Sequence, residues 1–340
     1  MSSTVNTLEY LASRTQIDLD ALDLAAAKKG ACGKPYTDAT SNQIEIFFQL
    51  ENPANAKVIA QSISLATELH ALYPGLSFEE LAAEVAGVIL AARVIPYISG
   101  KVHVMANPCY SFDTEKIIAS GRRYHAIFRH VDGAADLSRV VMKVPATWEG
   151  MQACKSLKTE GIQTLATTVF SLEQCILAGE VGCVSVSPFI HDLKRVVDPA
   201  HKDDDPLVQL CVEAQEYYRR HAIPTNVKAC SSGSIDEILQ LAGVDAHTIE
   251  LADLEAMSVE TREQNATEAL SLFGSSKANH QNGSSRPKSY VDDEARFRVD
   301  LAASKGGKSQ AKLYRAIDVF CDFQKKDEQL FRDARSRGSY

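Results

Sequence analysis

The sequence predicts an α/β protein whose eight parallel strands close into a (β/α)8, or TIM, barrel with an additional C-terminal helix. Eight short β-rich runs alternate with longer amphipathic segments, an order that is typical of a parallel sheet. These units fill about 270 residues, the usual size of such a barrel. No Gly-x-Gly-x-x-Gly motif follows an expected strand, which argues against an open, dinucleotide-binding sheet.

Each expected strand is a short run of mostly apolar residues, and each helix is predicted by spacing. In chain order, the strands are expected at residues 17–22, 36–41, 102–106, 140–144, 164–170, 183–188, 226–230 and 248–251. Between them, apolar residues recur every three or four positions, and several segments begin with Ser, Thr or Asp, as helices do. The main helices are expected at residues 53–72, 78–93, 114–128, 149–160, 172–178, 206–221 and 234–242.

Three regions follow one another along the chain. Residues 1–273 are expected to form the catalytic barrel. Residues 274–293 are rich in Gly, Ser, Asn and Lys and are expected to form a flexible loop or linker. Residues 294–340 are expected to form a helical extension that packs on the barrel. The apolar stripe of this extension consists of Leu313, Ile317, Phe320 and Phe323.

Composition excludes several classes of partner. The formal net charge of −8 and the pI near 5.6 argue against binding to nucleic acid or to an anionic membrane. Residues 1–12 are too polar for a signal-peptide core and no run is long enough to span a bilayer, so we expect a cytoplasmic protein. His191 and His201 have no second His or Cys at ligand spacing, so we expect no metal and no dissociable cofactor.

One lysine is placed for chemistry. Lys143 lies near the C-terminal end of the expected apolar strand 140–144, and barrel enzymes carry their catalytic groups at these strand ends. Burial lowers the pKa of a lysine, and the neutral amine attacks a carbonyl carbon to form a Schiff base. The iminium that results is an electron sink for breaking or forming a neighbouring carbon–carbon bond. The alternative is a lysine that simply points into solvent.

The segment around Lys143 decides between these alternatives. Lys143-Val-Pro-Ala-Thr-Trp-Glu-Gly150 resembles the Schiff-base lysine signature of the transaldolase family. Further similar segments follow in the family's order, and they include Thr-Thr-Val-Phe-Ser-Leu at 167–172 and Ser-Pro-Phe at 187–189. Upstream, Asp-Ala-Thr-Ser-Asn at 38–42 resembles the family's other signature. The resemblance spans roughly residues 17–255 and identifies the chain as a divergent member.

This resemblance implies an activity and roles for particular residues. The implied reaction is a class I aldolase or transferase reaction of carbohydrate metabolism, typified by the pentose phosphate pathway, in which a dihydroxyacetone-type unit moves between small carbonyl or sugar substrates. Lys143 takes the nucleophile position, Asp20 transfers protons and Thr167 helps hold a catalytic water. Asp18 and Asp23 are rivals of Asp20, because the loop after this strand differs in length. A homodimer is also implied.

Four further positions are implied to contact the substrate. Asn42 falls on a residue that binds substrate hydroxyls, and Ser187 and Phe189 line the pocket after the sixth strand. Ser231, after the next strand, is expected to contact the substrate as well.

The third strand departs from the family pattern. Transaldolases carry a glutamate there that works through a bound water, whereas Met105 occupies that position here. His103 lies two residues earlier and therefore faces the same side of the strand. An imidazole titrates in the range needed for acid–base catalysis, so His103 is expected either to replace the glutamate or merely to pack and hydrogen-bond.

The phosphate-binding positions also depart from the pattern. Asp192 and Gly233 stand where the family carries two arginines, and Leu165 replaces a pocket asparagine. An aspartate repels the phosphate dianion that a guanidinium grips. The cations that remain to replace the arginines are Lys194, Arg195 and Lys228. Two alternatives to a sugar-phosphate enzyme therefore stay open: a specialised aldolase of secondary metabolism acting on a non-phosphorylated carbonyl compound, and a catalytically inactive barrel that binds a metabolite.

Overall fold

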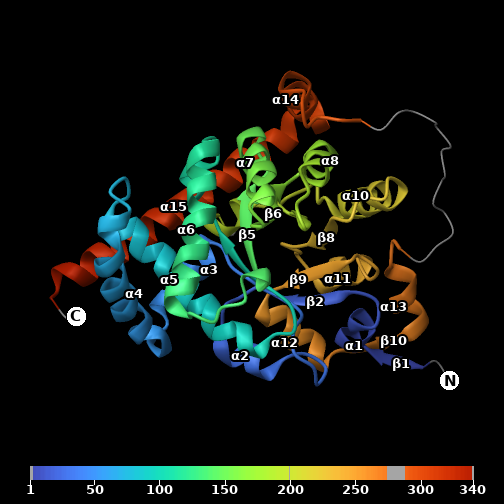
Figure 1. Cartoon of the computed structure of the whole chain (residues 1–340). Coiled ribbons are helices and arrows are strands. Elements are labelled where there is room, and N and C mark those ends of the chain that lie inside the picture. Colours follow the sequence, from blue (N-terminus) through green and yellow to red (C-terminus); the bar gives the residue numbers. More distant parts are fainter. Residues whose placement is uncertain (1–2, 199, 274–287, 339–340) are drawn as a thin grey trace.

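The computed structural model describes residues 3–198, 200–273 and 288–338 and has a closed parallel barrel at its centre (Figure 1). Neighbouring strands follow chain order, and the last strand pairs with the first to close the ring. The barrel strands are β2 (Gln16–Leu19), β3 (Ala39–Thr40), β4 (Val102–Met105), β5 (Val140–Pro145), β6 (Gln163–Val169), β7 (Ser185–Pro188), β8 (Asn226–Ala229) and β9 (Ala246–Ile249). The predicted (β/α)8 fold is confirmed.

Helices surround the barrel. They are α2 (Leu24–Lys29), α3 (Gln43–Glu51), α4 (Ala56–Leu69), α5 (Phe78–Val94), α6 (Thr114–Val131), α7 (Trp148–Thr159), α8 (Leu172–Val181), α9 (Lys194–Val197), α10 (Val208–Arg220), α11 (Ile235–Gln240), α12 (Leu251–Val259) and α13 (Gln264–Leu270). Of these, α5, α6, α7, α8 and α10 pack directly on the barrel strands. Local chemistry sets the ends of the helices. The Ser77 side chain caps the start of α5, and Gly182 ends α8 in the left-handed conformation.

The last strand and the start of the chain differ from expectation. A strand was expected at 248–251, but β9 lies two residues earlier and Leu251 already begins α12. Apolar Ile249 and Leu251 stand on either side of the strand's end, and the strand begins with Ala246 and His247, so hydrophobicity does not mark its bounds. An unexpected two-stranded antiparallel sheet joins β1 (Thr4–Asn6) to β10 (Thr261–Glu263). Together with α1 (Thr7–Ala12), it ties the N-terminus to the segment that follows the barrel.

The C-terminal region consists of two helices, α14 (Glu294–Ala303) and the 29-residue α15 (Lys308–Ser336). Figure 1 shows α15 running from α14 past α6 to α4, and it packs on α3, α5 and β6. The four residues of the expected stripe are all buried, and each such side chain contributes about 1.5–3 kcal/mol. The helix therefore covers part of the end of the barrel where the strands terminate.

Most of the predicted linker 274–293 lies outside the described residues, and only its end, from Lys288, is described. Tyr290 is fully buried there and stacks edge-on against Phe297 of α14. The backbone N–H groups of Tyr290 and Val291 both donate to Glu180. This end of the segment is therefore packed against the barrel.

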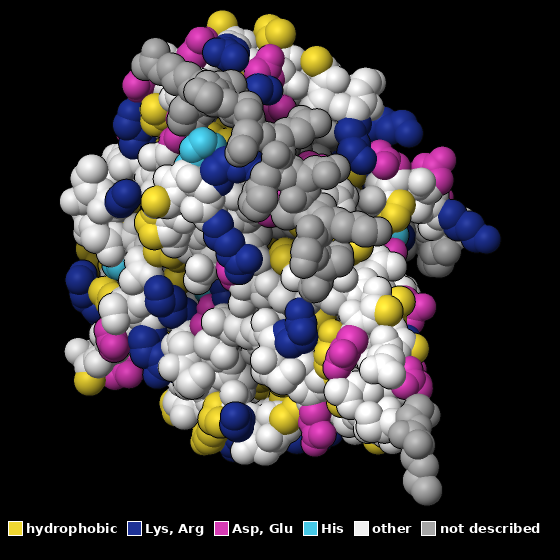
Figure 2. Space-filling model, turned by 90° about the vertical axis from the view of Figure 1, so that its right-hand side faces the viewer, with side chains coloured by type: hydrophobic (Ala, Val, Ile, Leu, Met, Phe, Trp, Pro, Cys, Tyr) yellow, Lys and Arg dark blue, Asp and Glu magenta, His cyan; other side chains and the backbone are white. Residues whose placement is uncertain are grey.

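The face of the molecule drawn in Figure 2 is mixed in character. On the face drawn in Figure 2, acidic and basic side chains alternate and hydrophobic atoms appear in scattered spots. Within the described part of the chain, every helix is too short or too polar to cross a bilayer.

Candidate active site

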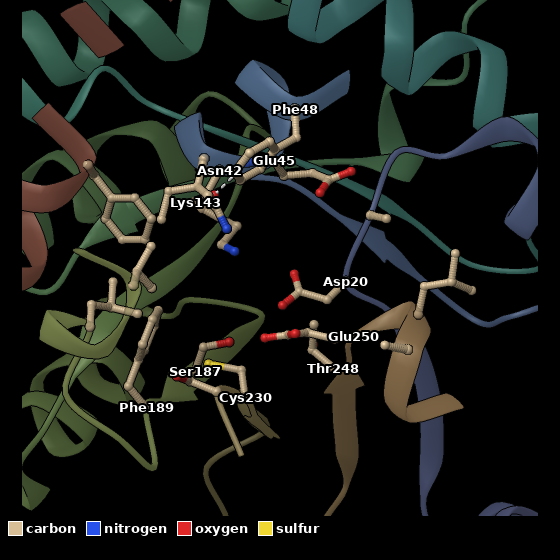
Figure 3. A pocket seen from close by; sticks show the side chains of 18 of the residues that line it. Asp20, Asn42, Glu45, Phe48, Lys143, Ser187, Phe189, Cys230, Thr248 and Glu250 are labelled. Carbon is tan, nitrogen blue, oxygen red and sulfur yellow. Dashed lines mark hydrogen bonds between the residues drawn. The ribbon is translucent and has the colours of Figure 1, made fainter. Parts of the chain in front are cut away.

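A cavity of about 460 Å³ opens at the C-terminal ends of the barrel strands. Six of the eight residues proposed from the sequence line it, whereas His103 and Thr167 do not. The six are Asp20, Asn42, Lys143, Ser187, Phe189 and Ser231. Figure 3 shows that Lys143 and Asp20 extend into the cavity from facing sides. Residues far apart in the sequence meet here because parallel strands end at the same edge of a closed barrel.

Lys143 is positioned by strand β5 and by the turn that follows it. The side chain is almost fully buried, and Nζ donates a hydrogen bond of 2.9 Å to Thr40 Oγ1. Among the described residues, no carboxylate forms an ion pair with this amine. Burial lowers the pKa of Lys143, and the more distant charge of Asp20 opposes this effect only in part. Gly150 allows α7 to start close to the strand, since a Cβ there would lie 2.2 Å from Pro145 O.

Asp20 directly follows β2 and faces Lys143 across the cavity. Its backbone N–H donates to Ile249 O, which continues the barrel ladder by one residue. Burial raises the pKa of this carboxyl group, and the nearby Lys143 partly counters the shift. Its two rivals have other partners, although Asp23 also lines the cavity. Asp18 accepts from Lys228 inside the barrel, and Asp23 caps α2.

Asn42 begins α3, and its side-chain oxygen accepts the backbone N–H of Glu45. Its amide group is left to face the cavity. Glu45, three residues later, occupies the position where a capping-box glutamate returns to the N-cap backbone. Its carboxylate instead accepts the N–H of Leu22 and the amide of Gln49. Glu45 therefore lies beside the loop that carries Asp20 and lines the cavity.

The opposite wall is formed after β7 and β8. Ser187 belongs to β7, and Phe189 follows it and stacks on Phe170 and on Phe320 of the C-terminal helix. Ser231 follows β8 with φ at +60°, a left-handed conformation that is uncommon for residues other than glycine. The adjacent Cys230 is buried, and burial raises the pKa of its thiol. This wall is more apolar than the side that carries Asp20.

His103 lies inside the barrel in a buried ion cluster, away from the cavity. Lys228 Nζ lies 2.5 Å from Asp18 Oδ2 and 2.7 Å from Asp38 Oδ2. His103 Nε2 lies 3.4 Å from the same oxygen of Asp38. Burial lowers the pKa of His103 more than Asp38 raises it. Lys228 is thereby committed to this cluster and does not reach the cavity.

Thr167 lies on β6 behind the cavity wall. Its hydroxyl oxygen is buried and has no hydrogen-bond partner among the described residues. The next residue, Thr168, has φ at +54°, and the pairing of β6 with β7 shifts register between Ala166 and Val169. Such bulges re-aim side chains next to functional sites. The hydroxyl of Thr167 is therefore a polar group available to a small molecule such as water.

An aspartate that forms a salt bridge, Asp192, occupies the position expected for a phosphate-binding arginine. Asp192 is buried and pairs with Arg315 of α15 at 2.5 Å, so it ties the C-terminal helix to the barrel. Of the three substitute cations, only Arg195 lines the cavity. Its guanidinium donates to Ser232 O and lies 3.9 Å from Glu250. The cavity thus presents four carboxyl groups and two cations: Asp20, Asp23, Glu45, Glu250, Lys143 and Arg195.

Several lining residues were not proposed from the sequence. Glu250 and Thr248 come from the strand whose boundary was misplaced, and Phe320 comes from a helix distant in the chain. For Glu45, a signal was present in the spacing Asn42-x-x-Glu45, which predicts a helix start. No pattern in the sequence indicates that its side chain turns toward Asp20.

No group of three or more His, Cys, Asp or Glu suited to a metal ion occurs among the described residues. The groups that face the cavity are an amine, carboxyl groups, hydroxyls and an amide, a set suited to carbonyl addition and proton transfer. With the closed barrel, this set places the chain among the (β/α)8-barrel enzymes.

Comparison with known proteins narrows this class. The family model for transaldolase/fructose-6-phosphate aldolase matches residues 17–306. A transaldolase of Shewanella oneidensis is 31% identical over 261 residues, which cover 74% of this chain and 79% of the relative. A transaldolase of Aeromonas salmonicida is 30% identical over 328 residues, which cover 95% of this chain and 97% of that relative. The chain belongs to the transaldolase/fructose-6-phosphate aldolase family and is an enzyme of the transferase or aldolase type.

Proposed function

We propose that this enzyme transfers a dihydroxyacetone-type unit between carbonyl substrates through a Schiff base on Lys143, and that these substrates carry no phosphate. The observation that carries the proposal is the buried amine of Lys143, which faces the cavity without a carboxylate in contact. Desolvation favours the neutral, nucleophilic form of such an amine.

The steps follow from the groups that face the cavity. The amine of Lys143 adds to the donor ketone, and the carbinolamine loses water to give an iminium. Asp20 takes the proton of the donor's C4 hydroxyl, the C3–C4 bond breaks, and its electron pair moves to the iminium nitrogen to form an enamine. An aldehyde leaves, and the enamine then attacks the acceptor aldehyde in the reverse sense. Asn42 and Ser187 hold substrate hydroxyls. That Thr167 helps hold the water for hydrolysis stays a prediction, because its hydroxyl is buried outside the cavity lining.

Charge supports the absence of phosphate. Arg195 is the one cation besides Lys143 among the described residues that line the cavity, and its guanidinium already faces Glu250. A phosphate dianion would meet Asp20, Asp23 and Glu250 in this lining, and the guanidinium of Arg195 is already engaged. Uncharged polyhydroxy ketones such as dihydroxyacetone and fructose avoid this repulsion.

The homodimer that the family resemblance implies stays a prediction.

Borohydride trapping tests the proposal, because it reduces an iminium to a stable secondary amine. The enzyme is incubated with borohydride and dihydroxyacetone, fructose or fructose 6-phosphate, and the adduct is located by peptide mass spectrometry. We expect an adduct on Lys143 with the unphosphorylated ketones, and none in Lys143→Met. Lys155→Met, which changes an exposed lysine, is the matched control.

Two results would contradict the proposal. Absence of an adduct with every ketone would favour an inactive, metabolite-binding barrel. Faster turnover of fructose 6-phosphate than of fructose would show that the cavity accepts phosphate despite its carboxyl groups.

A further inference from the structure

Glu45 is a half-buried acid of the cavity lining that the proposed steps do not use. It lies on the first turn of α3, lines the cavity and faces the loop after β2 (Figure 3). One carboxylate oxygen accepts the N–H of Leu22 at 3.1 Å and the side-chain amide of Gln49 at 3.0 Å. Among the described residues, no cation pairs with it. It is therefore a carboxyl group placed in a site without a counter-charge.

The surroundings of Glu45 favour its protonated form. Burial raises its pKa, Asp20 and Asp23 raise it further, and the bonds from Gln49 and Leu22 oppose the shift, which brings the pKa to about 8. The facing groups come from the loop after β2 (Asp20), the cap of α2 (Asp23) and α3 itself (Gln49). When two carboxyl groups such as Asp20 and Glu45 repel each other in one cavity, one of them keeps its proton and can act as an acid, and the other ionises and can act as a base.

Other candidates for an acid are less suited. Burial also raises the pKa of Glu250, but this carboxyl group lies 3.9 Å from the guanidinium of Arg195, a counter-charge that Glu45 lacks among the described residues. His103 is enclosed in the ion cluster with Asp38, and Met105 cannot transfer a proton. Burial raises the pKa of Cys230, which leaves it a very weak acid. Loss of water from a carbinolamine requires a proton at the departing oxygen, and Asp20 acts as the base in the same cycle.

We propose that Glu45 is the general acid that protonates the departing carbinolamine hydroxyl, and that Asp20 and Glu45 work as a base–acid pair. In this step, the C–O bond breaks, the nitrogen lone pair forms the C=N bond, and the Glu45 proton leaves with the hydroxyl as water. During hydrolysis of the final iminium, Glu45 recovers a proton from the attacking water. This inference rests on the proposed Schiff base at Lys143.

The test is Glu45→Gln, because glutamine keeps the shape and an oxygen that accepts from Leu22 but carries no acidic proton. We expect kcat to fall by about 10²-fold, the lower end of general acid–base contributions. In the wild type, activity falls as pH rises through about 8, where Glu45 loses its proton. This alkaline limb disappears in Glu45→Gln. Glu51→Gln, at the exposed end of the same helix, is the control and keeps the wild-type profile.

Trapping kinetics separate this inference from the proposed function. We expect the Lys143 adduct to form more slowly in Glu45→Gln, and Glu45→Asp to restore part of the rate. Thermal unfolding of each variant establishes that it is folded. An adduct that forms in Glu45→Gln at the wild-type rate, with the alkaline limb intact, would overturn the inference and leave the Schiff base standing. Absence of any adduct in the wild type would overturn both.

Discussion

Two lysines are buried inside the same barrel, and their surroundings give them opposite properties. Lys228 contacts two carboxylates, and although burial alone lowers its pKa, Asp18 and Asp38 outweigh burial and raise it. Among the described residues, the one hydrogen-bond partner of Lys143 Nζ is the hydroxyl of Thr40, and burial lowers the pKa of Lys143. The first lysine is a permanent charge that holds strands together. The second is proposed to be a nucleophile because no carboxylate contacts it among the described residues, and burial outweighs the charge of Asp20.

Replacing the unpaired lysine should abolish activity and leave the fold intact. In Lys143→Met, we expect kcat/KM to fall by roughly 10⁴-fold or more, since no other amine enters the cavity among the described residues. The free energy of unfolding should stay equal or rise, because an amine buried without a counter-ion is removed. Steady-state kinetics and urea denaturation measure the two effects. A fully active Lys143→Met would remove the distinction between the two lysines.

Replacing the paired lysine should have the reverse result. Lys228→Met leaves Asp18 and Asp38 buried without their cation, and we expect a loss of about 3–5 kcal/mol in unfolding free energy. Lys155→Met breaks an exposed pair with Asp292 and should change stability by less than about 1 kcal/mol. Both values come from urea denaturation. A Lys228 variant as stable as the Lys155 control would show that the cluster adds no stability.

The stability of the wild type relative to Lys143→Met should depend on pH. The pKa of Lys143 is lower in the folded than in the unfolded protein, so the unfolded state binds more protons between the two values. The contribution of Lys143 to the free energy of unfolding therefore rises with pH until the pH reaches the ordinary pKa of a lysine. The slope is at most about 1.4 kcal/mol per pH unit. Subtracting the two denaturation series between pH 7 and 9.5 isolates this slope. A flat difference would show that the pKa of Lys143 is not lowered.

The smallest expected effect concerns the one hydrogen bond of the unpaired lysine. Thr40→Val keeps the shape of the side chain and removes the acceptor of Lys143 Nζ. A neutral hydrogen bond contributes about 1 kcal/mol, so we expect a decrease in kcat of roughly 5- to 10-fold. Rapid-quench measurement of adduct formation checks the step. An unchanged rate would mean that β5 alone orients the amine.

Much of this fold could be predicted because local patterns repeat along the chain. The run Val140–Pro145 is apolar, ends in a turn and precedes a capped helix, so its strand and the lysine at its end are predictable. The strand Ala246–Ile249 was misplaced by two residues because it begins with the weakly apolar pair Ala246 and His247, while apolar Leu251 already belongs to the next helix. The two helices after Asp293 bury the expected stripe, but no pattern indicates that Phe320 reaches the cavity.

For the site, the sequence by itself determined the residue types and their order, including Lys143, Asp20 and Asn42 at the ends of strands or at the start of a helix. Only the tertiary structure decided their charges. Lys228 has two carboxylate partners, His103 is enclosed by the same cluster, and Glu45 turns toward Asp20. The physical reason is that a pKa depends on desolvation and on charges a few ångströms away, and these neighbours come from strands that are distant in sequence.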